Sequence, residues 1–118
     1  LFMPSIYNLK EHERGDTWGG IAINISANGD PLLSPITEVI MEVRTRDLRQ
    51  TLMGRWDTAN GTIQITDPHS SIRIMPRIVN FPPATYNYDV QVTFESGREL
   101  TIQKGTWTIK DDVSKKVY

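Results

Sequence analysis

Apolar side chains recur at every second position along much of this 118-residue chain. Successive side chains of an extended strand point to opposite faces, so a two-residue repeat places the apolar ones on one side of a sheet. The repeat is most regular at Tyr88, Val90, Val92 and Phe94, where polar residues occupy the positions between them. No helical repeat of comparable length is found. The pattern predicts an all-β fold built from half-buried strands.

Turn-forming residues separate the alternating stretches and set the number of strands. The clearest turn signals are Asn28-Gly29-Asp30-Pro31, Asn60-Gly61, Asp67-Pro68 and Ser96-Gly97. The segments between such signals predict seven to eight strands, over residues 5–10, 17–25, 36–45, 50–53, 62–66, 71–75, 85–95 and 98–110. Short strands at this spacing are typical of an immunoglobulin-like antiparallel β-sandwich. An open barrel is the alternative.

Length and composition limit the domain organisation and the classes of partner. The 118 residues predict one sandwich domain over 1–118, with a core over about 5–110 and a C-terminal tail over 111–118. The chain has no cysteine, which excludes disulfides, thiolate zinc sites and cysteine nucleophiles. Basic and acidic residues nearly balance without long blocks of either sign, so nucleic acid is not an expected partner. Neither a signal peptide nor an apolar run that could span a membrane is recognisable.

The last long strand changes the phase of its apolar residues. Leu100 and Ile102 share one parity, whereas Trp107 and Ile109 have the opposite parity. An inserted residue would reset the alternation, and glycine accepts the backbone angles that many β-bulges require. We therefore predict a bulge at Lys104-Gly105.

Two further structural roles follow from position. Tyr86 enters the strand 85–95 where a tyrosine corner would place a tyrosine whose hydroxyl bonds to upstream backbone, and an ordinary half-buried strand residue is the alternative. Arg44 and Asp89 fall on the polar parity of two long strands that would be neighbours. They predict a cross-strand ion pair that contributes about 0.2–1 kcal/mol.

Candidates for catalysis are few. His12 and His69 are the only imidazoles, and neither stands in a metal-ligand spacing. Asp111 and Asp112 are adjacent, so on a strand they would face opposite sides, which does not suit a catalytic carboxylate pair. Phosphate-binding loops and nucleophile elbows are also absent from the sequence. We therefore expect no enzymatic activity, no cofactor and no metal site.

Two motifs suggest binding instead. Arg14-Gly15-Asp16 spells a tripeptide that integrin receptors recognise, although a turn before the next strand is the plainer interpretation. Trp18 and Trp56 would form a sugar-binding platform if both were exposed, with Arg55 and His69 on the same candidate binding surface. Trp56 is the tryptophan expected at the surface. A carbohydrate-binding or adhesive module is therefore one functional hypothesis.

A second hypothesis comes from a resemblance carried by six ordered segments. They are Arg14-Gly15-Asp16-Thr17-Trp18, Ile40-Met41-Glu42-Val43-Arg44, Gly61-Thr62-Ile63-Gln64-Ile65-Thr66-Asp67, Thr85-Tyr86-Asn87-Tyr88-Asp89-Val90, Ser96-Gly97-Arg98 and Lys104-Gly105-Thr106-Trp107-Thr108-Ile109. In this order they resemble small phage and prophage virion domains. These are similar to the N-terminal domain of siphophage baseplate upper proteins and to domains attached to tail fibres.

The resemblance covers roughly residues 5–114 and brings its own expectations. It implies a sandwich that serves as a building block of a tail, baseplate or neck, with no catalytic residues. It implies other virion proteins as partners, self-association through exposed strand edges, and a protein made in the bacterial host cytoplasm and carried in the virion. Baseplate upper proteins continue beyond such a domain, whereas this sequence stops at Tyr118, as a small protein or an excised fragment would.

Overall fold

The computed structural model describes residues 5–25 and 34–111, which form strands and turns and contain no helix. The strands are β1 (Ser5–Ile6), β2 (Leu9–Glu13), β3 (Thr17–Trp18), β4 (Ile21–Asn24), β5 (Ile36–Arg44), β6 (Leu52–Asp57), β7 (Ile63–Asp67), β8 (Ser71–Ile74), β9 (Arg77–Ile78), β10 (Ala84–Phe94) and β11 (Glu99–Lys110). The predicted turn at Asn28-Gly29-Asp30-Pro31 and residues 112–118 of the predicted tail lie outside the described residues.

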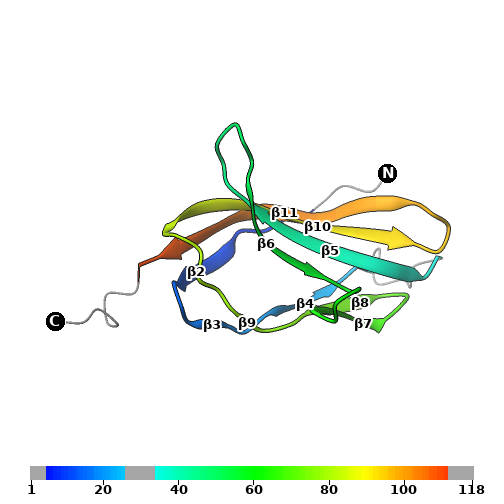
Figure 1. Ribbon diagram of the computed structural model, residues 1–118. Coiled ribbons are helices and arrows are strands. Elements are labelled where there is room, and N and C mark those ends of the chain that lie inside the picture. Colours follow the sequence, from blue (N-terminus) through cyan, green and yellow to red (C-terminus); the bar gives the residue numbers. More distant parts are fainter. Residues whose placement is uncertain (1–4, 26–33, 112–118) are drawn as a thin grey trace.

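The strands pack as two layers, which confirms the predicted all-β sandwich (Figure 1). One layer is a six-stranded sheet in the order β1-β11-β10-β5-β6, with β2 also paired to β11. The other layer holds the three-stranded sheet β4-β8-β7 and the short pair β3-β9. The core lies between the layers and follows the predicted alternation, since Val39, Met41 and Val43 of β5 and Val90 and Val92 of β10 are fully buried.

The large sheet is mixed, whereas the sequence predicted an antiparallel one. Both β1 and β2 run parallel to β11. The chain enters beside β11, follows it in the same direction, and then passes to the other layer through the turn at 14–16 (Figure 1). Alternation of side chains says which face a residue occupies but not which way a strand runs, so this direction had no signal in the sequence.

The predicted bulge exists, but its position at Lys104-Gly105 was wrong. Along the β10–β11 ladder Val90 pairs with Gln103 and the next residue of β10 pairs with Thr101, so Ile102 has no partner on β10. The inserted residue therefore lies two positions before the predicted one. A β-bulge of the common type needs no glycine, because its extra residue takes ordinary right-handed backbone angles.

The bulge aims two consecutive side chains into the protein. Ile102 and Gln103 are both buried, which an unbroken strand would not allow. The Nε2 group of Gln103 donates a hydrogen bond to the Tyr88 hydroxyl at 3.0 Å, and this hydroxyl donates to the carbonyl oxygen of Tyr7. A buried polar chain thus ties β11 and β10 to the segment between β1 and β2.

Gly105 has a different role, which is to admit the N-terminal segment to the sheet. A Cβ atom at this position would overlap the carbonyl oxygen of Tyr7 and lie 2.7 Å from the carbonyl carbon of that residue. The close approach allows the Tyr7 amide to donate to the Lys104 carbonyl at 2.9 Å. It also allows the Thr106 amide to donate to Asn8 Oδ1 at 3.1 Å.

Tyr86 makes the contact expected of a tyrosine corner. Its hydroxyl donates to the Pro82 carbonyl oxygen upstream, and its ring meets Phe81 edge-on with the centroids 5.7 Å apart. Burial raises the pKa of this hydroxyl above the ordinary tyrosine value, so it stays a donor at neutral pH. The bond fixes the path by which the chain enters β10.

Candidate functional site

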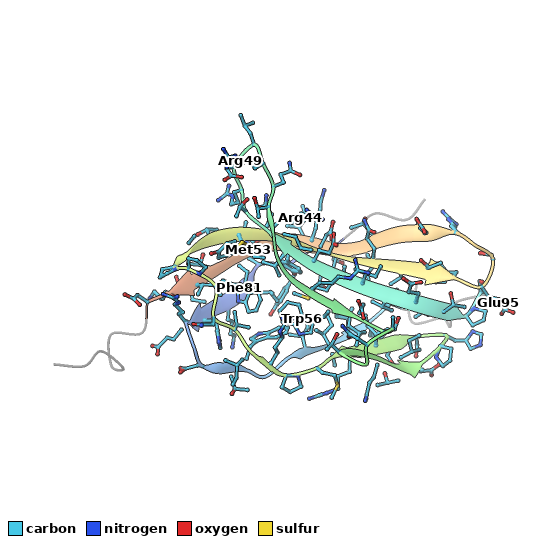
Figure 2. All side chains as sticks on the ribbon, viewed as in Figure 1. Arg44, Arg49, Met53, Trp56, Phe81 and Glu95 are labelled. Carbon is cyan, nitrogen blue, oxygen red and sulfur yellow. The ribbon has the colours of Figure 1, made fainter. Side chains whose placement is uncertain are left out.

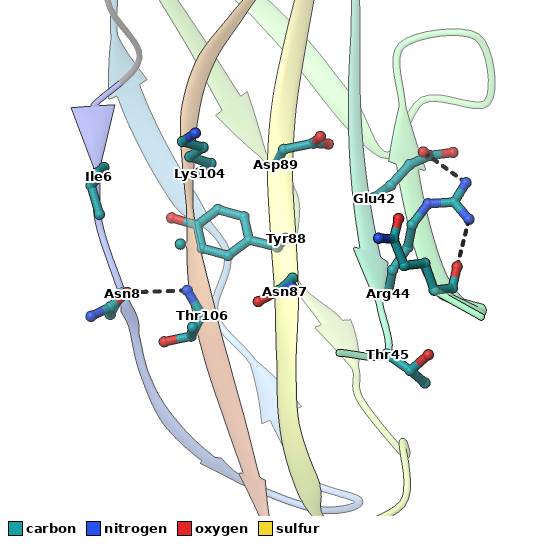
Figure 3. Close-up of a pocket in the computed structure, with 12 residues that line it drawn as sticks. Ile6, Asn8, Glu42, Arg44, Thr45, Asn87, Tyr88, Asp89, Lys104 and Thr106 are labelled. Atoms are coloured by element: carbon teal, nitrogen blue, oxygen red, sulfur yellow. Dashed lines mark hydrogen bonds and ion pairs between the residues drawn. The ribbon is translucent and has the colours of Figure 1, made fainter. Parts of the chain in front are cut away.

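The face of the large sheet turned away from the core carries a groove of about 430 Å³, which we call the outer groove. Its floor consists of the outward side chains of β5, β10 and β11 (Figure 3). Ile6 and Asn8 form one side, and Thr45 and Gln50 of the β5–β6 connection form the other. The outer groove is thus built by four strands that hydrogen bonds hold in fixed register.

Strand alternation explains which residues reach the outer groove. Tyr88 and Val90 point into the core, so Asn87 and Asp89 between them point outward. The register places Asn87 opposite Arg44, and it places Asp89 between Glu42 on one side and Lys104 on the other. The floor therefore combines acids, bases and an amide within one small area.

A chain of ion pairs runs along the β5–β6 side of this floor. Glu42 accepts from Arg44 Nη2 at 3.1 Å and from Arg55 Nη1 at 3.3 Å (Figure 3). Arg55 continues the chain to Asp57, whose Oδ2 accepts from Nε at 2.9 Å. The hydrogen bond from Arg55 lowers the pKa of Asp57 below the ordinary aspartate value. One carboxylate thus fixes two guanidinium groups on neighbouring strands.

The predicted ion pair between Arg44 and Asp89 was wrong within the described ranges of the chain. Arg44 pairs with Glu42 and donates from Nη1 to the Gln50 carbonyl at 2.9 Å. The register sets Asp89 opposite Glu42, a like charge, while Asn87 faces Arg44. Burial raises the pKa of Asp89, the Glu42 carboxylate raises it further, and Arg44 partly offsets both effects. Parity alone could not fix which residue faces which.

We expect the substitution Asp89→Asn to raise the melting temperature at pH 7. An acid whose pKa is raised by folding is held at a cost when ionised, and this cost disappears as the pH falls through the folded pKa. The stabilisation should therefore shrink as the pH is lowered toward about 4, where aspartate becomes protonated. Thermal unfolding followed by circular dichroism at several pH values measures it. Glu42→Gln is the matched control and should not stabilise, since it removes the anchor of two arginines.

The tryptophans do not form a platform, and the prediction that Trp56 is exposed was wrong. Trp56 and Trp107 are fully buried, and Trp18 is nearly so (Figure 2). The ring centroids of Trp18 and Trp107 lie 4.9 Å apart, and those of Trp18 and Trp56 lie 5.5 Å apart. Trp56 pairs with the buried Met41 in the β5–β6 ladder, which fixes its inward direction. Arg77 covers the Trp56 ring, with Cζ 4.7 Å from the centroid.

The four residues of the predicted binding surface do not come together. Trp18 and Trp56 belong to the core, whereas Arg55 lies on the outer side of β6 in the ion-pair chain. His69 is exposed in the turn between β7 and β8, in the other layer, where its amide donates to Asp67 Oδ1 at 2.9 Å. The predicted surface is therefore not a site.

The Arg14-Gly15-Asp16 motif is a turn that the fold holds from two sides. Gly15 adopts a φ of 88°, in the left-handed region that favours glycine, and its amide donates to the Val79 carbonyl at 2.8 Å. Arg14 Nε donates to Asn80 Oδ1 at 3.2 Å. His12 is engaged at the same turn, with Nε2 2.8 Å from the Asp16 carbonyl oxygen. These contacts agree with the turn interpretation.

Two searches over the described residues place limits on other sites. Residues 5–25 and 34–111 hold no group of three or more histidine, aspartate or glutamate side chains arranged to bind a metal ion. Over the same residues the structure has no helix with the length and apolarity needed to traverse a lipid bilayer.

One surface feature was not singled out from the sequence. The connection between β5 and β6 projects away from the sandwich beside the outer groove (Figure 1). It carries Leu48, which is fully exposed. The only signal in the sequence is an isolated leucine between charged residues, Arg46-Asp47-Leu48-Arg49, and a single apolar residue carries no periodicity.

Comparison with known proteins identifies no family. No family model matches the chain, and no curated protein matches it either. Among solved structures, the chain is similar to the crystal structure of CopC from Methylosinus trichosporium OB3b. The two share 9% sequence identity with a TM-score of 0.49, and the alignment covers 92% of this chain and 89% of that chain. Function is therefore argued from the surface of this chain.

Proposed function

We propose that this chain is a non-catalytic structural module of a phage or prophage virion, and that it acts in tail, baseplate or neck assembly by binding other virion proteins. The ordered segments that resemble small virion domains support the class of assembly. The outer groove, with the projecting connection beside it, is the observation that supports the mode of action. The neighbouring strands present it as one continuous surface.

The polar groups of the outer groove suit a protein partner. Asn87 and Lys104 make no side-chain hydrogen bond or ion pair within the part of the chain that the structure describes, so their amide and ammonium groups are available. Protein interfaces typically carry about ten direct hydrogen bonds and a polar rim. The paired arginines Arg44 and Arg55 hold their positions without a partner, which limits the ordering cost of binding.

The glycan-binding alternative loses its basis. It depended on exposed Trp18 and Trp56, and both rings are buried in the core. Sugar binding by stacking needs a ring face open to the ligand. The outer groove presents no tryptophan, so the protein-binding proposal fits this surface better.

The proposal is tested by incorporation into particles. A tagged chain is expressed in a host strain that carries the surrounding prophage with its own copy of the gene deleted, and particles are purified on a density gradient. The wild-type chain should co-sediment with particles, and Lys104→Glu, which reverses a charge in the outer groove, should reduce incorporation. Arg98→Glu in the β10–β11 turn is the control and should be incorporated normally. Recovery of the wild-type chain only in the unassembled fraction would contradict the proposal.

A further inference from the structure

The connection over residues 45–51, which we call the 45–51 loop, presents an apolar side chain at its tip. Leu48 lies at the midpoint of the loop, and its side chain has the highest exposure among the large apolar residues described. Arg46 and Arg49 flank it and are also exposed. Figure 2 shows the loop with Arg49 standing clear of both layers. A leucine in this position contacts only water in the isolated chain.

The loop is held in one shape by the side chain of Asp47. Its Oδ1 atom accepts three hydrogen bonds, from Thr45 Oγ1 at 2.8 Å and from the amides of Arg49 and Gln50 at 3.1 Å each. The Thr45 bond is the main reason that the pKa of Asp47 is lowered, so the carboxylate is ionised throughout the neutral range. The tip around Leu48 is therefore built on a fixed turn.

The base of the loop is closed by a second set of bonds. The Thr45 amide donates to the Thr51 carbonyl at 2.9 Å, and the Thr51 amide donates to Thr45 Oγ1 at 2.9 Å. Arg44 reaches from β5 to the Gln50 carbonyl at 2.9 Å. Gln50 has a φ of 47°, a left-handed conformation that costs a non-glycine residue about 1–2 kcal/mol. The surrounding bonds impose it.

The charges of the tip contrast with those of its base. Arg44 and Arg55 are paired with carboxylates, whereas the guanidinium groups of Arg46 and Arg49 have no partner within residues 5–25 and 34–111. A fixed loop thus offers one apolar side chain between two uncompensated positive charges. Preorganisation of this kind lowers the entropy that binding must overcome.

We propose that the 45–51 loop is a docking element whose Leu48 side chain enters an apolar pocket on a partner protein, with Arg46 and Arg49 facing carboxylates at the rim of that pocket. Charge complementarity selects an acidic partner surface. The identification of the partner as a virion protein rests on the proposed function above. A protein fits better than a lipid surface, because even a whole acyl chain gives only marginal membrane binding and one leucine buries far less.

The test adds purified chain back to particles that lack it and measures the bound fraction by sedimentation. Leu48→Ser should weaken binding about 10- to 100-fold, the loss expected when one leucine no longer becomes buried. Arg46→Glu combined with Arg49→Glu should weaken binding more at low salt than at high salt. Ile78→Ser, which removes another exposed apolar side chain in the opposite layer, is the matched control and should bind as wild type does.

The outcomes separate the two proposals. Failure of the wild-type chain to bind particles would overturn the proposed function and the partner named here. Wild-type binding that Leu48→Ser leaves unchanged would overturn only the docking role of the loop. Leucine-dependent sedimentation with phosphatidylglycerol vesicles, or a leucine-dependent dimer in light scattering, would replace the acidic protein partner with a membrane or a second copy of the chain.

A measurement on the free chain tests the preformed shape directly. Backbone ¹⁵N relaxation should give residues 45–51 order parameters close to those of the sheet, near 0.85. Asp47→Ala should lower them while β5 and β10 keep theirs, and should weaken particle binding although Leu48 is present. High mobility of the wild-type loop would contradict preorganisation.

Discussion

Replacing Trp107 by alanine is expected to lower the free energy of unfolding by about 3–5 kcal/mol, the range found when buried large aromatic residues are truncated. Trp107 is fully buried, and its ring lies within 6.2 Å, centroid to centroid, of Trp18, Trp56 and Phe81. Its Nε1 group also donates to the Lys10 carbonyl at 3.1 Å, which bonds β11 to β2. Domains are commonly stable by only 5–15 kcal/mol, so a large part of this stability would be lost.

Urea unfolding followed by far-ultraviolet circular dichroism measures this effect without depending on tryptophan fluorescence. Trp56→Phe provides a matched comparison with Trp107→Phe. The Trp56 Nε1 group is buried and has no hydrogen-bond partner among the described residues, so its removal relieves an unsatisfied donor. Trp107→Phe, which breaks a hydrogen bond, should therefore cost more than Trp56→Phe. The reverse order would contradict the assigned orientation of the two rings.

The substitution Gly105→Ala is expected to lower the free energy of unfolding by about 1–3 kcal/mol, as overpacking does in well-packed sites. The new methyl group would meet backbone of Tyr7, which unlike a flexible side chain has little room to move. The first contact to suffer should be the bond from the Tyr7 amide to the Lys104 carbonyl. Hydrogen exchange at the Tyr7 amide should rise more than exchange in β10.

Gly19→Ala is the control for this effect. A Cβ atom at Gly19 would have no neighbour within 4 Å, so the change should stay within about 0.5 kcal/mol. Equal losses for the two substitutions would show that the crossing of the N-terminal segment over β11 is not what requires glycine at position 105.

The longer strands were predictable because each buries one face along four or more residues. In β5 and β10 the alternation extends over enough positions to mark both their existence and their inward side. The pair β3 and β9 has two residues in each strand, too few for a repeat, so β9 was missed and the stretch 17–25 was predicted as one strand. The division of 5–10 into β1 and β2 was missed for the same reason.

The details of the site depended on information that parity does not contain. Which residue faces Arg44 follows from the register of β5 and β10, and a shift of two residues keeps the parity while changing every pair. Trp56 lies in a strand too short to show which side is buried. The 45–51 loop has no repeat at all, because its shape comes from side-chain bonds of Asp47 to nearby backbone.

The parallel placement of β1 and β2 beside β11 determines how the domain would respond to tension. Force applied between Ser5 and Lys110 would pull adjacent strands past each other lengthwise, so their hydrogen bonds would be strained together and not opened one after another. Rupture would then depend on the simultaneous failure of a whole ladder, and the rate of forced unfolding would be correspondingly low. A protein joined to neighbours at these two points would act as a stiff mechanical link.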